Sequence, residues 1–252
     1  DQVLPQGTEV IPIIANTSTN TDSWTTDNTT DLVILPNQTV TVSKDMVMGD
    51  ITVMGDGKLV IPSGKTLTAD HIYLRAGHPS NSNYKNYEYT YPQLAVVGTL
   101  NITSDTIYLD YLLNKKQQYT FAVPVSVKRA DIKASTGEDV TFKVAAYNGA
   151  ARATGGNGWG YTEATTFEPG VGYTIFATPL SVVGSDGFPT KQTYVTLRIP
   201  MVVGDTYTEN EPRSVAVTKY PSTLNSTLAD WNLVSVPYMC NYKGALSIGD
   251  VG

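Results

Sequence analysis

Alternating hydrophobic and polar residues recur in short runs from residue 31 to about residue 110. Residues 39–42 (TVTV) and 65–68 (KTLT) show the alternation clearly, and turn residues such as those at 55–57 (GDG) and 62–64 (PSG) separate the runs. A period of two in segments rich in Val, Ile, Thr and Tyr is typical of half-buried strands. The pattern therefore predicts a succession of short strands and no helix of more than two turns.

A weak internal repeat organises these strands. The segment ITVMGDGKLVI (51–61) resembles LAVVGTLNI (94–102), and DHIYL (70–74) resembles SDTIYL (104–109). Each copy consists of strand, turn, strand, turn and an Ile-Tyr-Leu strand. Units of this size predict the coils of a short β-solenoid, in which each coil stacks its inward side chains on the next. A meander within a β-sandwich is the alternative that the repeat leaves open.

The pattern divides the chain into three parts. Residues 1–30 are polar and contain one possible strand near Ile11 to Ile14, while 16–31 has the character of a loop. Residues 31–116 form the solenoid-like segment, with a Tyr-rich loop at 76–93. Residues 117–252 contain further strands separated by Gly-rich turns, expected at 140–146, 161–165, 172–177, 194–200, 214–220 and 232–237. The expected fold is all-β: a short solenoid-like or layered β segment followed by an antiparallel β-sandwich.

Composition narrows the possible partners. Charged residues make up 16% of the 252 residues, and the formal net charge is −6. An acidic chain repels phosphate backbones, so we expect no nucleic-acid partner. No run of about 18 apolar residues predicts a membrane span, and the opening residues DQVLP have the character of a mature start whose export segment has been removed. One Cys and two His are too few for a Cys-based zinc site, and we expect no cofactor or metal.

Three motifs in the second half resemble those of a known group of proteins. They are YTFAVPVSVKRADI (119–132), FEPGVGYTIFA (167–177) and DWNLVSVPYMCNY (230–242). In this order they resemble the β modules of large exported, adhesin-like surface proteins of Gram-negative gut and oral anaerobes, with Gly-x-Gly-Tyr and Trp-Asn-Leu-Val-x-x-Pro strands. Ser235-Val236 stands where Gly-Asn is common in that group. The resemblance implies an extracellular or cell-surface location and a role in display or adhesion, and its motifs carry no catalytic residues.

Catalysis has weak support in the residues themselves. Cys240 would need a nearby imidazole to act as a nucleophile, but the two histidines, His71 and His78, both lie in the first half. We expect Cys240 to be a reduced packing residue, following a core strand that contains Trp231 and Leu233. Carboxylates that could form a hydrolytic pair are Glu138, Asp139, Glu163, Glu168, Glu209 and Glu211. Carboxylates in turns that could contact calcium are Asp27, Asp31, Asp50 and Asp56, although no Asp-x-Asp-x-Asp loop is present.

Aromatic residues in polar loops are the candidate ligand-binding residues. They are Tyr84, Tyr87, Tyr89 and Tyr91 of the Tyr-rich loop, and Trp159 in a Gly-rich segment. Flat apolar rings beside amide groups suit a sugar ring or a protein surface, although the tyrosines could instead pack their loop onto the fold. We therefore expect a non-catalytic secreted or cell-surface module, adhesin-like, for host or dietary glycans or surface proteins. The alternatives are a structural spacer and a polysaccharide-acting hydrolase or lyase that uses Asp or Glu.

Overall fold

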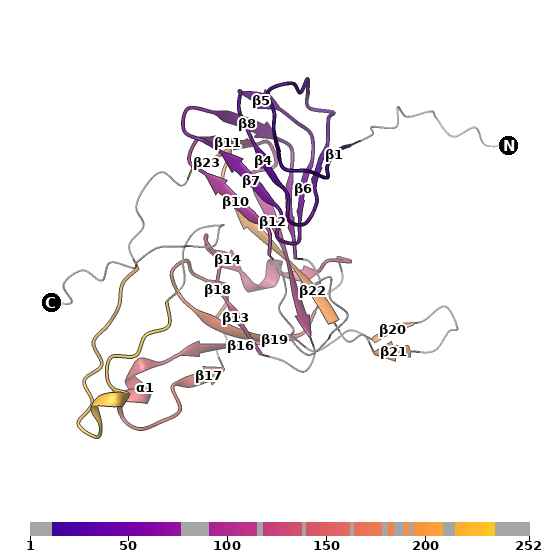
Figure 1. Cartoon of the computed structure of the whole chain (residues 1–252). Coiled ribbons are helices and arrows are strands. Elements are labelled where there is room, and N and C mark those ends of the chain that lie inside the picture. The colour runs from indigo at the N-terminus through magenta and orange to yellow at the C-terminus, as the bar shows by residue number, and fades with distance from the viewer. Residues whose placement is uncertain are drawn as a thin grey trace. The chain divides into compact units, whose positions relative to one another are not determined.

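The computed structural model describes residues 12–76, 91–114, 118–137, 140–161, 164–177, 181–183, 189–191, 194–208 and 215–234. Nearly all regular elements are strands (Figure 1), so the expected all-β class is confirmed. Internal contacts divide the chain into two units: the first comprises Asp1–Leu109 with Val203–Glu211, and the second Asp110–Val202 with Pro212–Gly252. Within the described residues, no helix has the length and apolar character needed to cross a membrane.

The first unit is a parallel β-solenoid with three sheets. Sheet 1 contains β1 (Ile13–Ala15), β3 (Leu32–Ile34), β6 (Ile51–Met54), β9 (Ile72–Arg75) and the start of β12 (Thr106–Asn114). Sheet 2 contains β2 (Thr19–Asn20), β4 (Thr39–Thr41), β7 (Lys58–Ile61) and β10 (Gln93–Val96). Sheet 3 contains β5 (Met46–Val47), β8 (Thr66–Ala69) and β11 (Thr99–Ile102). The chain returns to sheet 1 once per coil, and corresponding strands pair in parallel, as the repeat predicts.

The alternation seen in the sequence becomes a ladder of inward side chains. Leu32, Ile51 and Ile72 occupy the same position on neighbouring strands of sheet 1, and all three are buried. Leu59 and Leu94 do the same in sheet 2. Burying a side chain of this size contributes about 1.5–3 kcal/mol, so the repeated positions hold the coils together.

The first coil begins earlier than expected. The segment 16–31 was expected to be a loop, but it contains β2, which pairs with β4 through Thr19 and Val40. The possible strand near residues 11–14 is present as β1, shifted by two residues at its start. Neither strand shows a clear alternation of apolar and polar residues. Both are stabilised by parallel pairing with the strand of the next coil.

The chain returns to the solenoid after leaving it. The short strand β23 (Thr206–Tyr207) pairs antiparallel with β11, with Leu100 opposite Tyr207. The backbone N–H of Ile102 also donates to the carbonyl of Asp205 at 3.0 Å. The sequence pattern predicts that this segment belongs with residues 117–252, whereas its contacts place it in the first unit. Tyr207 is buried there against a strand edge that would otherwise stay open.

The second unit is built from antiparallel strands. Its main sheet has the order β13 (Tyr119–Phe121), β19 (Tyr173–Ala177), β16 (Phe142–Tyr147) and β17 (Trp159–Tyr161). The end of β12 lies beside β22 (Tyr194–Val202), which pairs with β15 (Lys133–Ala134). Two strand pairs complete it, β14 (Val127–Lys128) with β18 (Thr166–Phe167) and β20 (Ser181–Val183) with β21 (Pro189–Lys191). The helices are short: α1 (Gly149–Ala153) and the 3-10 turns Arg129–Asp131 and Ser226–Leu228.

Aromatic rings fill the core of the second unit. The ring centroids of Phe121 and Phe167 are 5.4 Å apart, and those of Phe167 and Tyr173 are 5.3 Å apart, both in edge-to-face arrangement. Such pairs add about 0.5–1.5 kcal/mol to the free energy gained by burial. The motif segments 119–132 and 167–177 thus meet in one core.

Two expected strands are not found where the structure describes them. Residues 215–220 contain no strand, and of 232–234 only Val234 forms an isolated bridge, with Val171. Side chains take the hydrogen bonds that a strand ladder would use: Thr218 N–H donates to Asn232 Oδ1 at 3.1 Å and Tyr220 N–H donates to Asp230 Oδ1 at 2.7 Å. Such side-chain bonds compete with sheet formation.

Candidate functional site

The predicted ligand-binding residues divide between described and undescribed parts of the chain. Tyr84, Tyr87 and Tyr89 lie outside the described residues. Tyr91 is half-buried just before β10 in the first unit, and Trp159 starts β17 in the second. Of the predicted ligand-binding residues that the structure describes, Trp159 is the one that lies in the second unit.

Trp159 lies on the edge strand of the main sheet. It is opposite Tyr147 in the pairing of β16 with β17, and the two rings meet edge to face with centroids 5.2 Å apart. A Cβ on Gly158 would lie 2.7 Å from the Tyr147 ring, so glycine is needed for this approach. Trp159 remains 38% exposed, which leaves apolar ring surface accessible beside a second aromatic residue.

Trp231 is more exposed than the sequence suggested. We expected it in a core strand, but it is 55% exposed. Its indole N–H donates to the carbonyl oxygen of Thr227 at 2.8 Å, and Asp230 exchanges hydrogen bonds with Tyr220 just before it. The ring is therefore fixed by its loop and left open to solvent, since the described residues 231–233 form no strand that would bury it.

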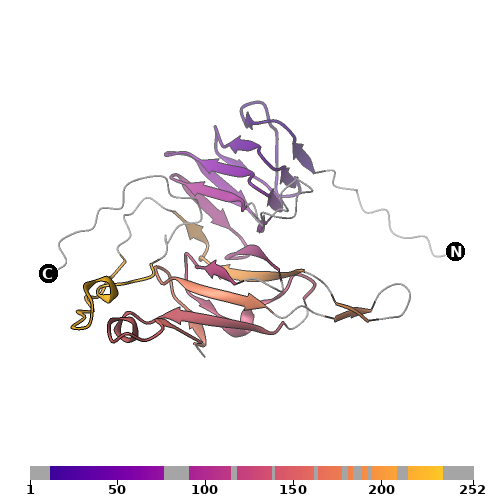
Figure 2. The ribbon, with the colours of Figure 1, turned by 60° about the horizontal axis from the view of Figure 1, so that its bottom comes forward.

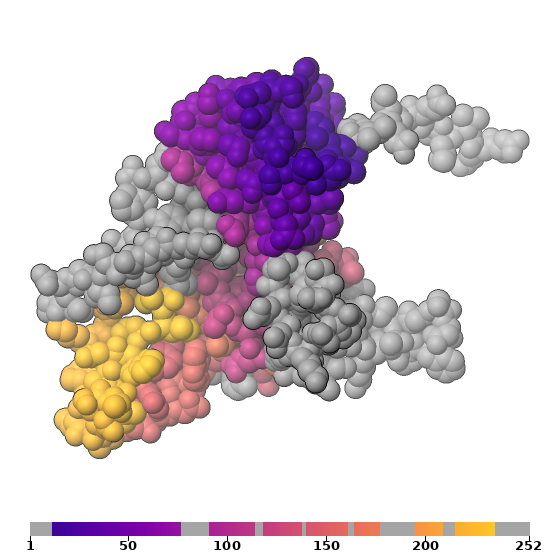
Figure 3. Space-filling model, viewed as in Figure 1, coloured from indigo at the N-terminus to yellow at the C-terminus, as the bar shows by residue number. Residues whose placement is uncertain are grey.

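Both tryptophans belong to one end of the second unit. Tyr147 leads through Asn148 into α1, whose first residue Gly149 lies against Tyr220 and the carbonyl of Trp231. The hydroxyl of Ser222 donates to the carbonyl of Ala153 at 2.6 Å, the last residue of α1. Figures 1 and 2 both show α1 beside the yellow segment 215–234, and Figure 3 shows their atoms adjoining on the surface. We call this surface the indole end, and its exposed apolar residues include Trp159, Leu224 and Trp231.

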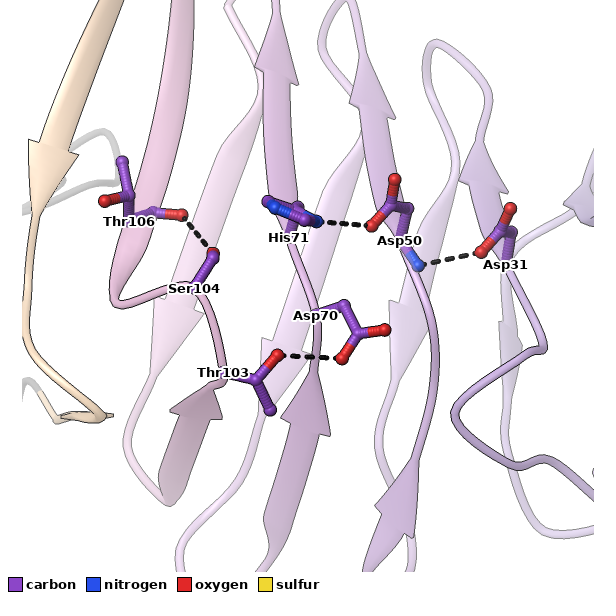
Figure 4. Close-up of polar contacts among 7 residues, drawn as sticks. All are labelled: Asp31, Asp50, Asp70, His71, Thr103, Ser104 and Thr106. Atoms are coloured by element: carbon purple, nitrogen blue, oxygen red, sulfur yellow. Dashed lines mark hydrogen bonds and ion pairs between the residues drawn. The ribbon is translucent and has the colours of Figure 1, made fainter.

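A second cluster lies in the first unit, where the chain turns into sheet 1 (Figure 4). Asp31, Asp50 and His71 each directly precede a strand of this sheet. The carboxylate of Asp31 accepts the backbone N–H of Asp50 at 2.8 Å, and His71 Nδ1 lies 2.8 Å from Asp50 Oδ1. An ionised carboxylate only accepts hydrogen bonds, so Nδ1 carries the proton in this pair. We call this cluster the Asp50–His71 corner.

Aromatic rings extend the corner along the outer face of sheet 1. Tyr73 and Tyr108 stack with centroids 5.3 Å apart and an interplanar angle of 14°, and the His71 ring lies 6.0 Å from that of Tyr73. This stacking is what adjacent in-register strands impose on outward-facing rings, since the strands lie about 4.8 Å apart. The guanidinium of Arg75 lies over Tyr73 at 5.6 Å.

The other carboxylates considered as calcium ligands, Asp27 and Asp56, accept hydrogen bonds from residues in turns. Asp27 accepts hydrogen bonds from the N–H and the hydroxyl of Thr29 and from the hydroxyl of Thr30, and the Thr29 hydroxyl contributes most to holding its pKa below the ordinary 3.8. Asp56 accepts the N–H of Asn37 at 2.6 Å. Among the residues that the structure describes, no three His, Cys, Asp or Glu side chains are close enough to hold a metal ion.

The catalytic alternatives fall mostly outside the described residues. These are Glu138, Asp139, Glu163, Glu209, Glu211, His78 and Cys240. Glu168 is described and accepts a hydrogen bond from the Ser126 hydroxyl. A hollow of about 530 Å³ in the second unit is lined in part by Arg129 and Phe142. The Arg129 guanidinium lies over the Phe142 ring at 5.1 Å and donates to the Phe142 carbonyl at 2.9 Å, so it serves to pack this wall.

No protein-family model, curated protein or solved structure matches this chain significantly. The resemblance to exported β modules is therefore an expectation from the motifs alone. The Asp50–His71 pair was not among the residues expected from the sequence, although the sequence contains a signal for it. Asp31, Asp50 and His71 recur at the length of one coil, so they become neighbours once the solenoid register is known.

Proposed function

We propose that this chain is a non-catalytic secreted or cell-surface module, adhesin-like, that binds glycan or protein ligands through the indole end. The observation that carries the proposal is Trp231, whose ring is 55% exposed while its N–H is already bonded to Thr227. The ring therefore presents an apolar face to solvent, and its N–H needs no hydrogen bond from a ligand.

A binding surface whose rings are already fixed loses less conformational entropy when a ligand binds. Immobilising a side chain on binding costs about 0.5–1.5 kcal/mol, and a ring that is already fixed avoids most of this cost. Tryptophan is also among the residues that dominate binding energy in interfaces. Trp159, placed by its contact with Tyr147, adds a second such ring at the same end.

The extracellular or cell-surface location rests on a different support. The motifs at 119–132, 167–177 and 230–242 resemble those of exported surface modules. The low share of charged residues, 16%, and the abundance of Thr, Ser and Asn are in keeping with such proteins. These features support the location without reference to a ligand.

The test compares three variants of the whole chain on a glycan array and against immobilised surface-protein preparations. Trp231→Ala and Trp159→Ala should each weaken retained binding by at least tenfold, the effect expected of a hot-spot aromatic residue. Val202→Ala is the matched control, because Val202 is an exposed apolar residue of the same unit. Thermal unfolding of each variant should match that of the parent chain.

Two results would contradict the proposal. The first is that the parent chain retains no ligand from either panel, which would favour the spacer alternative. The second is that both tryptophan variants bind as the parent does. Trp231→Phe refines the test: it keeps a ring but removes the bond to Thr227, so an intermediate loss would show that fixing the ring matters.

A further inference from the structure

We infer that the Asp50–His71 corner is a second binding site, for a neutral saccharide unit that presents two adjacent hydroxyl groups. The corner lies in the first unit, and the inference does not depend on the indole end. Three properties of the corner carry it: hydrogen-bonding atoms without partners, a rigid support, and a local charge that excludes anions.

The first property is a pair of open acceptor atoms. Asp50 uses Oδ1 for His71, and its second oxygen points away from the imidazole (Figure 4). Within the described part of the chain, neither Asp50 Oδ2 nor His71 Nε2 has a hydrogen-bond partner. When the ring carries only the proton on Nδ1, Nε2 is an acceptor. A ligand that satisfies both atoms must therefore donate two hydrogen bonds from neighbouring groups, as adjacent sugar hydroxyls do.

The second property is the rigidity of the support. The N–H of Ile51 donates to the carbonyl of His71 at 2.8 Å, and the N–H of Leu32 donates to the carbonyl of Asp50 at 2.9 Å. The carboxylate of Asp31 holds the N–H of Asp50 from the next coil. Both acceptor residues are thus fixed by the parallel ladder, and the side chains of Asp50 and His71 remain 45% and 39% exposed. A site on rigid strands needs little reorganisation to bind.

The third property is the chemistry of the surroundings. The ring of His71 is continuous with the Tyr73–Tyr108 stack, which offers apolar surface for the C–H groups of a sugar. The carboxylates at and beside the corner, Asp31, Asp50 and Asp70, outnumber its one basic side chain, His71 (Figure 4). Uronate or sulfate groups would bring further negative charge and further acceptors, so they fit poorly.

The experiment titrates the whole chain by calorimetry with defined probes. The neutral probes are hexasaccharides of glucose, mannose and xylose, and the anionic probe is hexagalacturonate. The variants are Asp50→Ala, His71→Ala and Trp231→Ala. Asp56→Ala is the matched control, since its carboxylate belongs to a turn of the same unit and accepts from Asn37 alone among the described residues.

We expect at least one neutral probe to bind, with an association constant reduced at least tenfold by Asp50→Ala and by His71→Ala. Asp56→Ala and Trp231→Ala should leave that constant unchanged. The inference is overturned if no neutral probe binds, if Asp50→Ala or His71→Ala weakens binding no more than Asp56→Ala does, or if hexagalacturonate binds more tightly than the neutral probes. If Trp231→Ala abolishes binding and Asp50→Ala does not, the sugar binds at the indole end: this inference then fails and the proposed function stands.

Discussion

Replacing Arg198 by Met should be among the most damaging single substitutions in the second unit. Arg198 donates two hydrogen bonds to Asp110, from Nε to Oδ1 at 2.8 Å and from the guanidinium NH2 to Oδ2 at 2.9 Å. Asp110 is only 5% exposed. The substitution keeps most of the apolar stem of the side chain and removes the charge that compensates the buried carboxylate.

The magnitude follows from the burial of the two partners. Removing one member of a buried ion pair typically costs about 3–5 kcal/mol, because the other charge stays buried without compensation. The Arg198 side chain is 29% exposed, so water can relieve part of that cost and we expect about 3 kcal/mol. For folding units of roughly 150–250 residues, 1 kcal/mol shifts the melting temperature by about 2–4 °C, which gives a decrease of about 6–12 °C.

The assay is thermal and urea unfolding of the parent chain, Arg198→Met, and the double variant Arg198→Met with Asp110→Leu. Replacing both partners by apolar residues removes the buried charge altogether, so the double variant should recover to within about 1 kcal/mol of the parent. A single variant that unfolds at the parent's temperature would refute the reasoning. So would a double variant that is no more stable than the single one.

Two further predictions concern the first unit. Gly98→Ala should destabilise the solenoid by about 1–3 kcal/mol or more in chemical denaturation, because the new Cβ would lie 2.3 Å from the carbonyl oxygens of both Pro62 and Lys65. The control is Gly160→Ala, whose new Cβ would have nothing within 4 Å. It should change the free energy of unfolding by less than about 0.5 kcal/mol. In an NMR pH titration, Asp27 should titrate below its ordinary pKa of 3.8. Its contribution to stability is therefore present above pH 3.8 and is lost as the pH falls through the lower pKa of the folded state. Thr29→Val should raise that pKa toward 3.8, and an unchanged titration would contradict the role given to the Thr29 hydroxyl.

The solenoid could be predicted because its physics is local and repeated. Alternation such as that around Leu59 marks each strand, and the similarity of 51–61 to 94–102 marks the coil. The strand β2 could not be predicted in this way, since Thr19 and Asn20 have no apolar alternation. Its strand conformation comes from pairing with β4, which is a tertiary effect.

The sites were harder to predict for two different reasons. Trp231 looked like a core residue because of its hydrophobic neighbours, but Asp230 and Asn232 bond to the facing backbone and prevent the strand. Pairing of Asp50 with His71 depends on the coil length, which places residues 21 positions apart side by side. Residue identity alone reveals neither feature: competing side-chain hydrogen bonds decide the exposure of Trp231, and strand register decides the pairing of Asp50 with His71.

The antiparallel strand β23 has a consequence for the order of folding. Asn101 and Thr206, which hydrogen-bond across this pair, are 105 residues apart in the sequence. Residues 110–202 are in effect an insertion within the first unit, so a chain made from its N-terminus exposes the β11 edge until the return segment has emerged. Closing so long a loop lowers the folding rate more than the stability. The interval before residue 206 is therefore when this protein should be most prone to pairing with another copy of itself.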